Sequence, residues 1–149
     1  MAGVINVTSE TPSINTCPIC LAEGTLIDTP NGPVPVEELR EGMIVYTQDS
    51  TGKKISGVIS ETASVQAPSL FKIITIVLSD GCSVSASPGH PTPDGRVISD
   101  LKVGDSLDGA TVVSVTSTPY CGYTFDILPG GGTGLYWANG ILLKSTLAQ

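Results

Sequence analysis

The sequence predicts an all-β fold, on three observations. Short runs rich in β-branched residues recur from position 25 to position 144, and Gly, Pro, Asn and Asp residues separate them. Hydrophobic residues make up 40% of the 149 residues but aromatic residues only 5%, so Val, Ile and Leu must fill the core, which favours sheets over helices. No segment shows a sustained helical period. The length and the apolar content suit a single domain.

The predicted strands follow one another with turn signals between them. Asn139-Gly140, between the last two apolar runs, is the strongest short hairpin signal in the chain. Helix is predicted only as about one turn near Val36–Arg40 and another near Ser99–Lys102. The predicted strands are Thr25–Thr29, Met43–Gln48, Lys54–Val65, Phe71–Ser79, Cys82–Ser87, Ala110–Thr118, Tyr123–Leu128, Leu135–Ala138 and Ile141–Lys144.

The two predicted helical turns belong to a longer internal similarity. The stretch from Val36 to Val45 aligns without gaps with the stretch from Ile98 to Leu107. Both contain an aliphatic residue, an acid, a Leu, a basic residue, a Gly and a final aliphatic residue in the same order. Two copies are too few for a solenoid or a propeller. The similarity therefore predicts a duplicated β subdomain, packed about a pseudo-two-fold axis.

Charge and hydropathy exclude several classes of partner. The formal net charge of −7 and the isoelectric point near 4.4 argue against nucleic acid, whose phosphates require a surplus of Lys and Arg. The seven basic residues are scattered, so they form no basic face for a membrane surface. No apolar run approaches the roughly 20 residues of a membrane span. Neither composition nor cysteine number indicates a cellular compartment, so localisation stays unknown.

The reactive side chains are one cysteine at position 20, the single histidine and a nearby hydroxyl. His90 is the only histidine in the chain, and it lies in Ser87-Pro88-Gly89-His90-Pro91, a stiff turn that should hold Ser87 and His90 on the same side. A thiol attacks an amide only if the carbonyl is polarised and the departing nitrogen receives a proton. A histidine can supply that proton, and a serine hydroxyl can hydrogen-bond the carbonyl oxygen.

Three blocks of sequence follow one another in order: Cys20 to Thr25 with the Val36–Val45 stretch, Asp80 to Asp105 around Ser87-Pro88-Gly89-His90, and Tyr123 to Ile127 with Leu135 to Leu142. These blocks resemble the Hint superfamily, the hedgehog and intein self-processing domains, most closely its bacterial intein-like members. The resemblance runs from Cys20 to about Lys144. It implies a horseshoe-shaped β fold with two pseudo-two-fold related subdomains, and an N-to-S acyl shift at the first residue of the domain.

The resemblance also implies a role for each site residue. Cys20 is the nucleophile, and the Ile19–Cys20 peptide bond becomes a thioester. His90 activates that bond, and Ser87 stands where the family usually has Thr, which keeps the hydroxyl. Asp126 matches an acid that steers the protonation of the nucleophile, although an Asp in Phe-Asp-Ile could equally make only a turn hydrogen bond.

The C-terminal end departs from the pattern of splicing inteins. Those proteins end in His-Asn followed by a nucleophile, and the Asn amide cyclises to release the downstream segment. Here Lys144 stands in the His position, Ser145 in the Asn position and Thr146 follows; serine has no side-chain amide to cyclise. A second histidine of the family is replaced by Gly134. We therefore expect N-terminal cleavage, or acyl transfer to water, a thiol or an amine, without efficient splicing.

This interpretation sets the expected domain limits and partners. Residues 1–19 form a flanking leader, residues 20–145 the Hint domain and residues 146–149 a C-terminal flank. The partners are the flanking segments of its own precursor and an external nucleophile. The domain acts once, as a monomer, rather than turning over like an enzyme, and it needs no metal or other cofactor.

Four alternatives stay open. The chain could be a splicing intein with an atypical C-terminus, or a catalytically inactive Hint scaffold that serves as an interaction module. Cys17 and Cys20 have the C-x-x-C spacing of redox centres and of half a zinc site, although no helix follows and no second ligand pair is visible. Cys17 could also regulate Cys20 by forming a disulfide with it. Cys82 and Cys121 are expected to be buried apolar residues.

Overall fold

A computed structural model of the chain describes residues 21–148. Within these residues every regular element is a strand or a single 3-10 turn, which confirms the all-β prediction. The elements are β1 (Leu21–Ala22), β2 (Leu26–Ile27), β3 (Val34–Pro35), η1 (Val36–Glu38), β4 (Ile44–Gln48), β5 (Lys54–Gln66), β6 (Lys72–Leu78), β7 (Ser83–Ala86), η2 (Ile98–Asp100), β8 (Ser106–Leu107), β9 (Ala110–Pro119), β10 (Tyr123–Pro129), β11 (Leu135–Ala138) and β12 (Ile141–Lys144).

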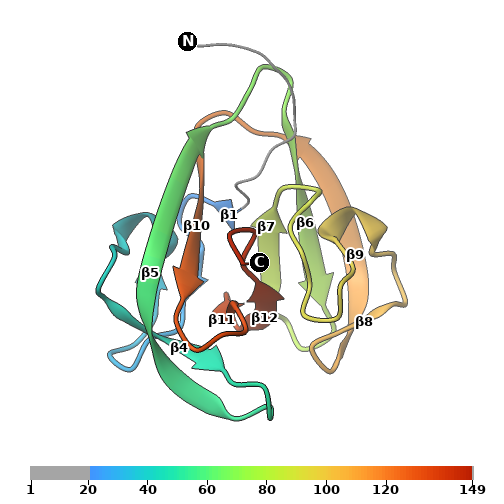
Figure 1. Cartoon of the computed structure of the whole chain (residues 1–149). Helices are drawn as coiled ribbons and strands as arrows, with labels where there is room; N and C mark the ends of the chain where they lie inside the picture. Colours follow the sequence, from blue (N-terminus) through green and yellow to red (C-terminus); the bar gives the residue numbers. More distant parts are fainter. Residues whose placement is uncertain (1–20, 149) are drawn as a thin grey trace.

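The strands form one large curved sheet and one small sheet. The large sheet has eight strands in the order β4-β5-β10-β1-β7-β6-β9-β8, and the small sheet has four in the order β12-β11-β2-β3. All pairings between these strands are antiparallel. Figure 1 shows β5 and β9 as the two long arms, with β11 and β12 between them near the base. This is the horseshoe that the sequence resemblance implies.

The predicted duplication appears in the backbone hydrogen bonds. Leu39 N donates to Val36 O over 3.2 Å, and Leu101 N donates to Ile98 O over the same distance. These two turns are η1 and η2, and each precedes the outermost strand of its half, β4 or β8. The sheet order is symmetric about the contact of β1 with β7. The two halves therefore meet at that pair of strands, and the ends of β1 and β7 lie at the centre of the molecule.

The last hairpin matches the sequence prediction residue for residue, whereas three strands were not predicted. Asn139 adopts the left-handed conformation (φ 50°) that the tight turn between β11 and β12 requires. The unpredicted strands β1, β3 and β8 contain two residues each. Two residues are too few to show an alternating pattern, so their pairing with distant strands alone defines them.

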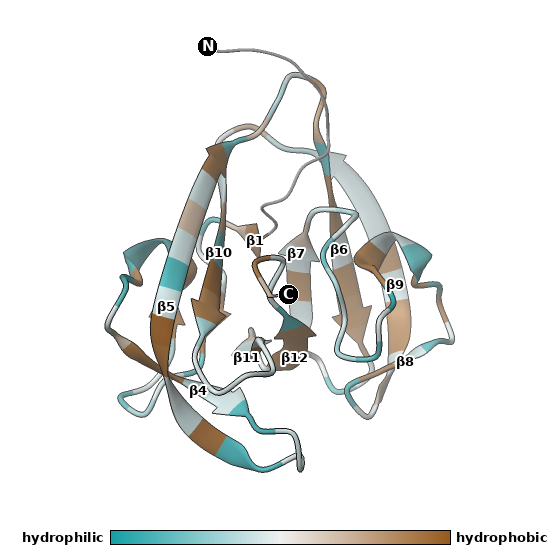
Figure 2. Ribbon diagram, in the orientation of Figure 1, coloured by the Kyte–Doolittle hydropathy of each residue, from teal (hydrophilic) through white to brown (hydrophobic). Residues whose placement is uncertain are grey.

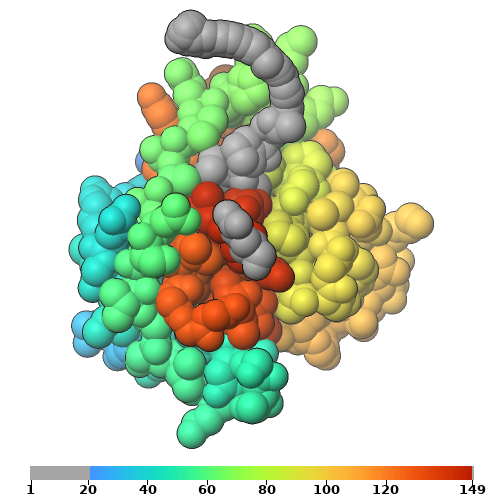
Figure 3. All heavy atoms as spheres, viewed as in Figure 1, coloured from blue at the N-terminus to red at the C-terminus, as the bar shows by residue number. Residues whose placement is uncertain are grey.

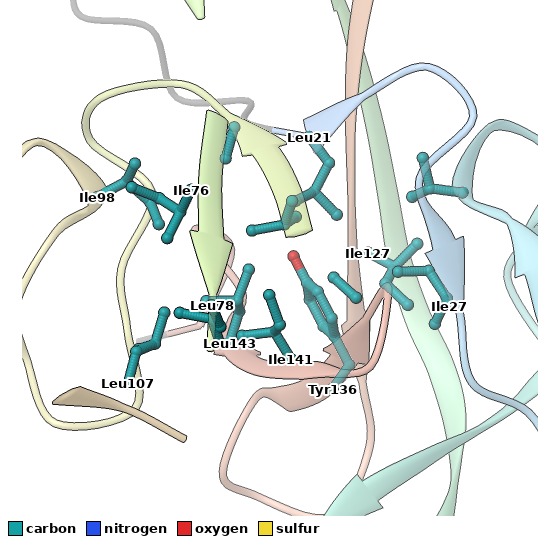
Figure 4. Close-up of a cluster of buried hydrophobic side chains, with 14 of the residues drawn as sticks. Leu21, Ile27, Ile76, Leu78, Ile98, Leu107, Ile127, Tyr136, Ile141 and Leu143 are labelled. Atoms are coloured by element: carbon teal, nitrogen blue, oxygen red, sulfur yellow. The ribbon is translucent and has the colours of Figure 1, made fainter. Parts of the chain in front are cut away.

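The core lies between the two sheets and is almost entirely aliphatic. Figure 4 shows Leu21, Ile127, Ile141 and Leu143 around the ring of Tyr136. All five side chains are fully buried. Along β5 the buried and exposed residues alternate, and Figure 2 shows the corresponding change between apolar and polar colours. The alternation keeps one face of each long strand against the core.

Candidate functional site

The start of the described chain is held between the two halves. Leu21 pairs with Ala86 at the end of β7 and with Phe125 in β10. The next residues along those two strands are Ser87 and Asp126. Three predicted residues, Cys17, Ile19 and the nucleophile Cys20, lie outside the described residues. Their roles stay predictions, but Leu21 is one peptide bond from Cys20.

The turn that follows β7 holds Ser87 and His90 together, as the sequence predicts. His90 N donates to Ser87 O over 3.1 Å, and Ile98 N donates to His90 O over 3.0 Å. Both side chains are fully buried. Among residues 21–148, Ser87 Oγ and His90 Nδ1 have no hydrogen-bond partner. Buried polar atoms are rarely left unpaired, because the loss of hydration costs about 1–3 kcal/mol, so two such atoms in one turn mark a site.

Burial lowers the pKa of His90 below its ordinary value near 6.5, against the smaller opposing effects of the Asp126 carboxylate and the Lys144 carbonyl. The cause is the loss of solvation, which disfavours the charged ring. The imidazole is therefore neutral at pH 7. The complete burial that lowers the pKa could not be predicted from the turn motif alone.

Asp126 lies inside β10 and not in a turn, so the alternative interpretation of a turn hydrogen bond is wrong. Its side chain is 1% exposed. Oδ1 accepts from Tyr136 Oη over 2.6 Å and from Ile127 N over 2.8 Å. Oδ2 accepts from Thr146 N over 2.7 Å and from Thr146 Oγ1. Four donors thus surround a carboxylate that can only accept.

Tyr136, on β11, is the site residue that the sequence analysis missed. Its hydroxyl donates to Asp126 Oδ1 and lies 3.2 Å from His90 Nε2. The His90 and Tyr136 rings meet edge to face, with centroids 6.2 Å apart. A buried tyrosine hydroxyl nearly always has a polar partner, and that rule could have suggested His90 and Asp126 as candidates. The sequence prediction placed Tyr136 in the last hairpin without assigning it a partner.

The C-terminal residues singled out by the sequence pack against this same site. Lys144 N, at the end of β12, donates to Pro91 O over 3.2 Å, directly after the His90 turn. Ser145 is buried, and its Oγ accepts from Leu147 N over 3.0 Å. Thr146 binds Asp126, as described above. Figure 3 shows the red C-terminal residues between the orange segment that contains β10 and the yellow segment that follows β7.

Gly134 leaves no room for the second histidine of the family. It has φ +73°, and a Cβ added to it would lie 2.6 Å from the Cβ of Ala148. Ser145 N also donates to Gly134 O over 2.8 Å. The C-terminal segment thus occupies the space that a side chain at this position would need.

The part of the chain from 21 to 148 offers no cluster of three His, Cys, Asp or Glu residues that could bind a metal. It also has no helix that is long and apolar enough to cross a membrane. Cys82 is half-buried and Cys121 is exposed, so the expectation that Cys121 is buried is wrong. It follows the end of β9, outside the apolar pattern of the strands.

The geometry joins a neutral imidazole with one unpaired nitrogen, an unpaired hydroxyl and a fully hydrogen-bonded carboxylate. Ser87 and His90 lie in the turn after β7 and Asp126 lies within β10, the two strands that pair with Leu21. An imidazole of this kind can accept a proton and return it, and the hydroxyl can donate to a developing negative charge. The arrangement suits acyl chemistry at a bond beside β1.

Known proteins give a consistent picture. A family model described as "Hint domain" matches residues 19–81. The DnaB intein from Synechocystis sp. PCC 6803 is 18% identical with a TM-score of 0.73, over 85% of this chain and 97% of that one. A bacterial intein-like domain from Clostridium thermocellum is 18% identical with a TM-score of 0.74, over 85% and 98%. The gp41-1 intein is 24% identical with a TM-score of 0.69, over 84% and 97%.

No curated protein sequence matches the chain significantly. At these identities the structural likeness shows the fold, which is that of the inteins over nearly their whole length. The family match covers the opening block and the first half of the duplication. Residues 19–81 therefore match the Hint domain, and the chain has an intein-like fold.

Proposed function

We propose that this Hint domain processes its own chain once, at the Ile19–Cys20 bond. The Cys20 thiol attacks the carbonyl carbon of Ile19, the C–N bond breaks, and the nitrogen of Cys20 takes up a proton. The product is a thioester, from which water, a small thiol or an amine removes the Ile19 acyl group. The observation that carries this proposal is the pair of unpartnered buried atoms, His90 Nδ1 and Ser87 Oγ, beside the strand that begins at Leu21.

His90 would move the proton in this reaction. As a neutral ring with an unpaired nitrogen, it can take the proton of the attacking thiol and return it to the departing nitrogen. The thiol proton thus becomes the proton on the departing nitrogen, and no external acid is needed. The low pKa favours the second half of the transfer, because a buried imidazolium gives up its proton readily. Acid–base catalysis of this kind contributes roughly 10²–10⁴-fold.

Ser87 and Asp126 would have different supporting roles. The free Ser87 hydroxyl can donate to the carbonyl oxygen of Ile19 as negative charge develops on it. Asp126 already accepts four hydrogen bonds. Its carboxylate therefore acts by orienting its neighbours and by its charge, rather than by taking the thiol proton.

Release of the downstream segment would be inefficient. Asparagine cyclisation needs a side-chain amide before the C-terminal junction, and Ser145 supplies only a hydroxyl. That hydroxyl already accepts from Leu147 N in a closed turn. We therefore expect N-terminal cleavage without splicing.

A second candidate function is acyl transfer to Thr146 within the chain. It is favoured by one observation, the hydrogen bond from Thr146 Oγ1 to Asp126 Oδ2, which sets a hydroxyl against a carboxylate. Transfer would give a branched ester on Thr146 that cannot be resolved without an Asn at 145. A branched, alkali-labile species that is absent in Thr146→Val would establish it.

The test of the main proposal is incubation of the full chain with dithiothreitol or hydroxylamine, followed by intact-mass measurement. We expect release of residues 1–19, with hydroxylamine leaving a hydroxamate on Ile19. Cys20→Ala should abolish release, whereas Cys121→Ala, at an exposed thiol away from the site, should leave it unchanged. Cleavage that persists in Cys20→Ala would overturn the assignment of the nucleophile, and a chain that stays whole would indicate the inactive scaffold.

Three further measurements separate the remaining alternatives. A first-order rate that does not depend on protein concentration is expected for a monomer acting on itself. Cys17→Ser should release the leader without prior reduction if Cys17 regulates Cys20 by a disulfide. Stoichiometric zinc in the purified chain would instead support the zinc module.

A further inference from the structure

A buried phenol lies between the imidazole and the carboxylate of the site. Tyr136 Oη is 2.6 Å from Asp126 Oδ1 and 3.2 Å from His90 Nε2. The phenol has a single proton to donate. A carboxylate only accepts, and hydrogen bonds to charged acceptors are the shorter and stronger ones. The phenol proton therefore belongs to the bond with Asp126.

This direction of the phenol proton decides which nitrogen of His90 is protonated. With its proton committed to Asp126, the phenol oxygen presents a lone pair to His90 Nε2. The contact is a hydrogen bond only if Nε2 carries the hydrogen. A neutral imidazole has one such hydrogen, so Nδ1 is then the bare nitrogen. Nδ1 is also the atom without a partner in the described part of the chain.

The other neutral tautomer of His90, with its hydrogen on Nδ1, would cost Asp126 a hydrogen bond. A hydrogen on Nδ1 would make Nε2 an acceptor, and Tyr136 would have to turn its proton from the carboxylate to the ring. Asp126 Oδ1 would then lose its shortest hydrogen bond, the 2.6 Å contact. This loss costs free energy, since unpaired buried polar groups are expensive.

We propose that Tyr136 is a positioning residue for the processing reaction: oriented by Asp126, it fixes His90 in the Nε2–H tautomer and leaves Nδ1 free to move the proton. The inference rests on the proposed function, and it adds a residue that acts only through His90. Tyr136 stands on β11 of the small sheet, whereas Asp126 lies on β10 of the large sheet and His90 in the turn that follows β7. The small sheet thus contributes to the chemistry and not only to the core.

The tautomer can be measured without any cleavage. Because His90 is the only histidine, a sample labelled with ¹⁵N-histidine gives one ring spin system, and its two-bond couplings distinguish the tautomers. The experiment uses the full chain carrying Cys20→Ala, so that the leader stays attached. We expect a single neutral Nε2–H ring. Tyr136→Phe removes one oxygen and keeps the ring, and it should convert the signal to a mixture or to Nδ1–H.

The same substitution is then tested for activity in the chain with Cys20. We expect Tyr136→Phe to slow thiol-induced cleavage by about 10²-fold, the lower end of what acid–base catalysis contributes. The matched control is Tyr123→Phe, the same atom removed from a half-exposed tyrosine on β10, which should change neither readout. An Nδ1–H ring in the Cys20→Ala chain with Tyr136 in place overturns the proposal, even if Tyr136→Phe does not fold. The proposal is also overturned if a folded Tyr136→Phe protein keeps both the Nε2–H tautomer of His90 and the unchanged rate of thiol-induced cleavage. Absence of all cleavage would overturn the proposed function instead, because the ring assignment is read independently.

Discussion

Replacing Asp126 by Asn should be among the most destabilising single changes in the domain. The substitution keeps the size and shape of the side chain and alters only its charge and one acceptor atom. Four donors point at this carboxylate, from Tyr136, Ile127 and Thr146. The side chain is 1% exposed, so water cannot replace what is lost.

The magnitude follows from counting the hydrogen bonds. An Asn oxygen can still accept from two of the four donors, but the NH2 group faces the other two as a donor. Two hydrogen bonds to a charged acceptor are lost, each worth about 1.5–3 kcal/mol. The free energy of unfolding should therefore fall by about 3–6 kcal/mol. A typical domain has only about 5–15 kcal/mol in total.

The assay is urea unfolding followed by circular dichroism, on chains that also carry Cys20→Ala. Asp28→Asn is the matched control, because Asp28 makes a partly exposed ion pair with Lys54 over 2.9 Å. Exposed pairs of this kind are worth less than about 1 kcal/mol. A loss below about 1 kcal/mol for Asp126→Asn would refute the view that the carboxylate organises the site.

Three further outcomes are expected. Because burial lowers the pKa of His90, the unfolded chain binds a proton below about pH 6.5 that the folded chain does not bind. The free energy of unfolding should therefore be constant above that pH and fall below it by up to about 1.4 kcal/mol per pH unit. Urea titrations should find a smaller slope in His90→Gln. The amide of Asn139 is held by backbone groups of β2 and β7, so mass spectrometry should show slower deamidation in the folded chain than in urea, and equal rates would contradict this. A Cβ at Gly57 would lie 2.5 Å from Gly130 O, so Gly57→Ala should cost about 1–3 kcal/mol, whereas Gly89→Ala, with nothing within 4 Å, should be near neutral in the same urea assay.

The strands could be predicted where the local pattern is strong, and the sheet order could not. The hairpin of β11 and β12 is specified by the apolar residues Leu135–Ala138 before Asn139-Gly140 and Ile141–Leu143 after it, all of them adjacent in sequence. The position of β1 between β7 and β10 depends instead on contacts such as Leu21 with Ala86 and with Phe125. Such contacts join residues far apart in the chain, and a two-residue strand has no period of its own to reveal them.

The candidate site shows the same division. Ser87 and His90 share one turn, so their proximity could be predicted from five consecutive residues. Asp126 could be placed only through the family resemblance, and its four hydrogen bonds come from three separate segments. Tyr136 carries no local signal, because in a strand a buried tyrosine looks like any other core residue. Its function depends on a hydroxyl whose partners are 10 and 46 positions away.

Asp126 connects the N-terminal and C-terminal ends of the domain through its hydrogen bonds. One of its oxygens orients the phenol that faces His90, close to the strand that begins one residue after the proposed nucleophile. The other oxygen binds Thr146, the first residue beyond the expected C-terminal limit of the domain. Loss of the hydrogen bonds from Thr146 would free the Asp126 side chain to move, and the hydrogen bond from Tyr136 would weaken as a result. The C-terminal segment is therefore part of the candidate site, and a chain truncated before Thr146 would lack two of the four hydrogen bonds that keep Asp126 in place.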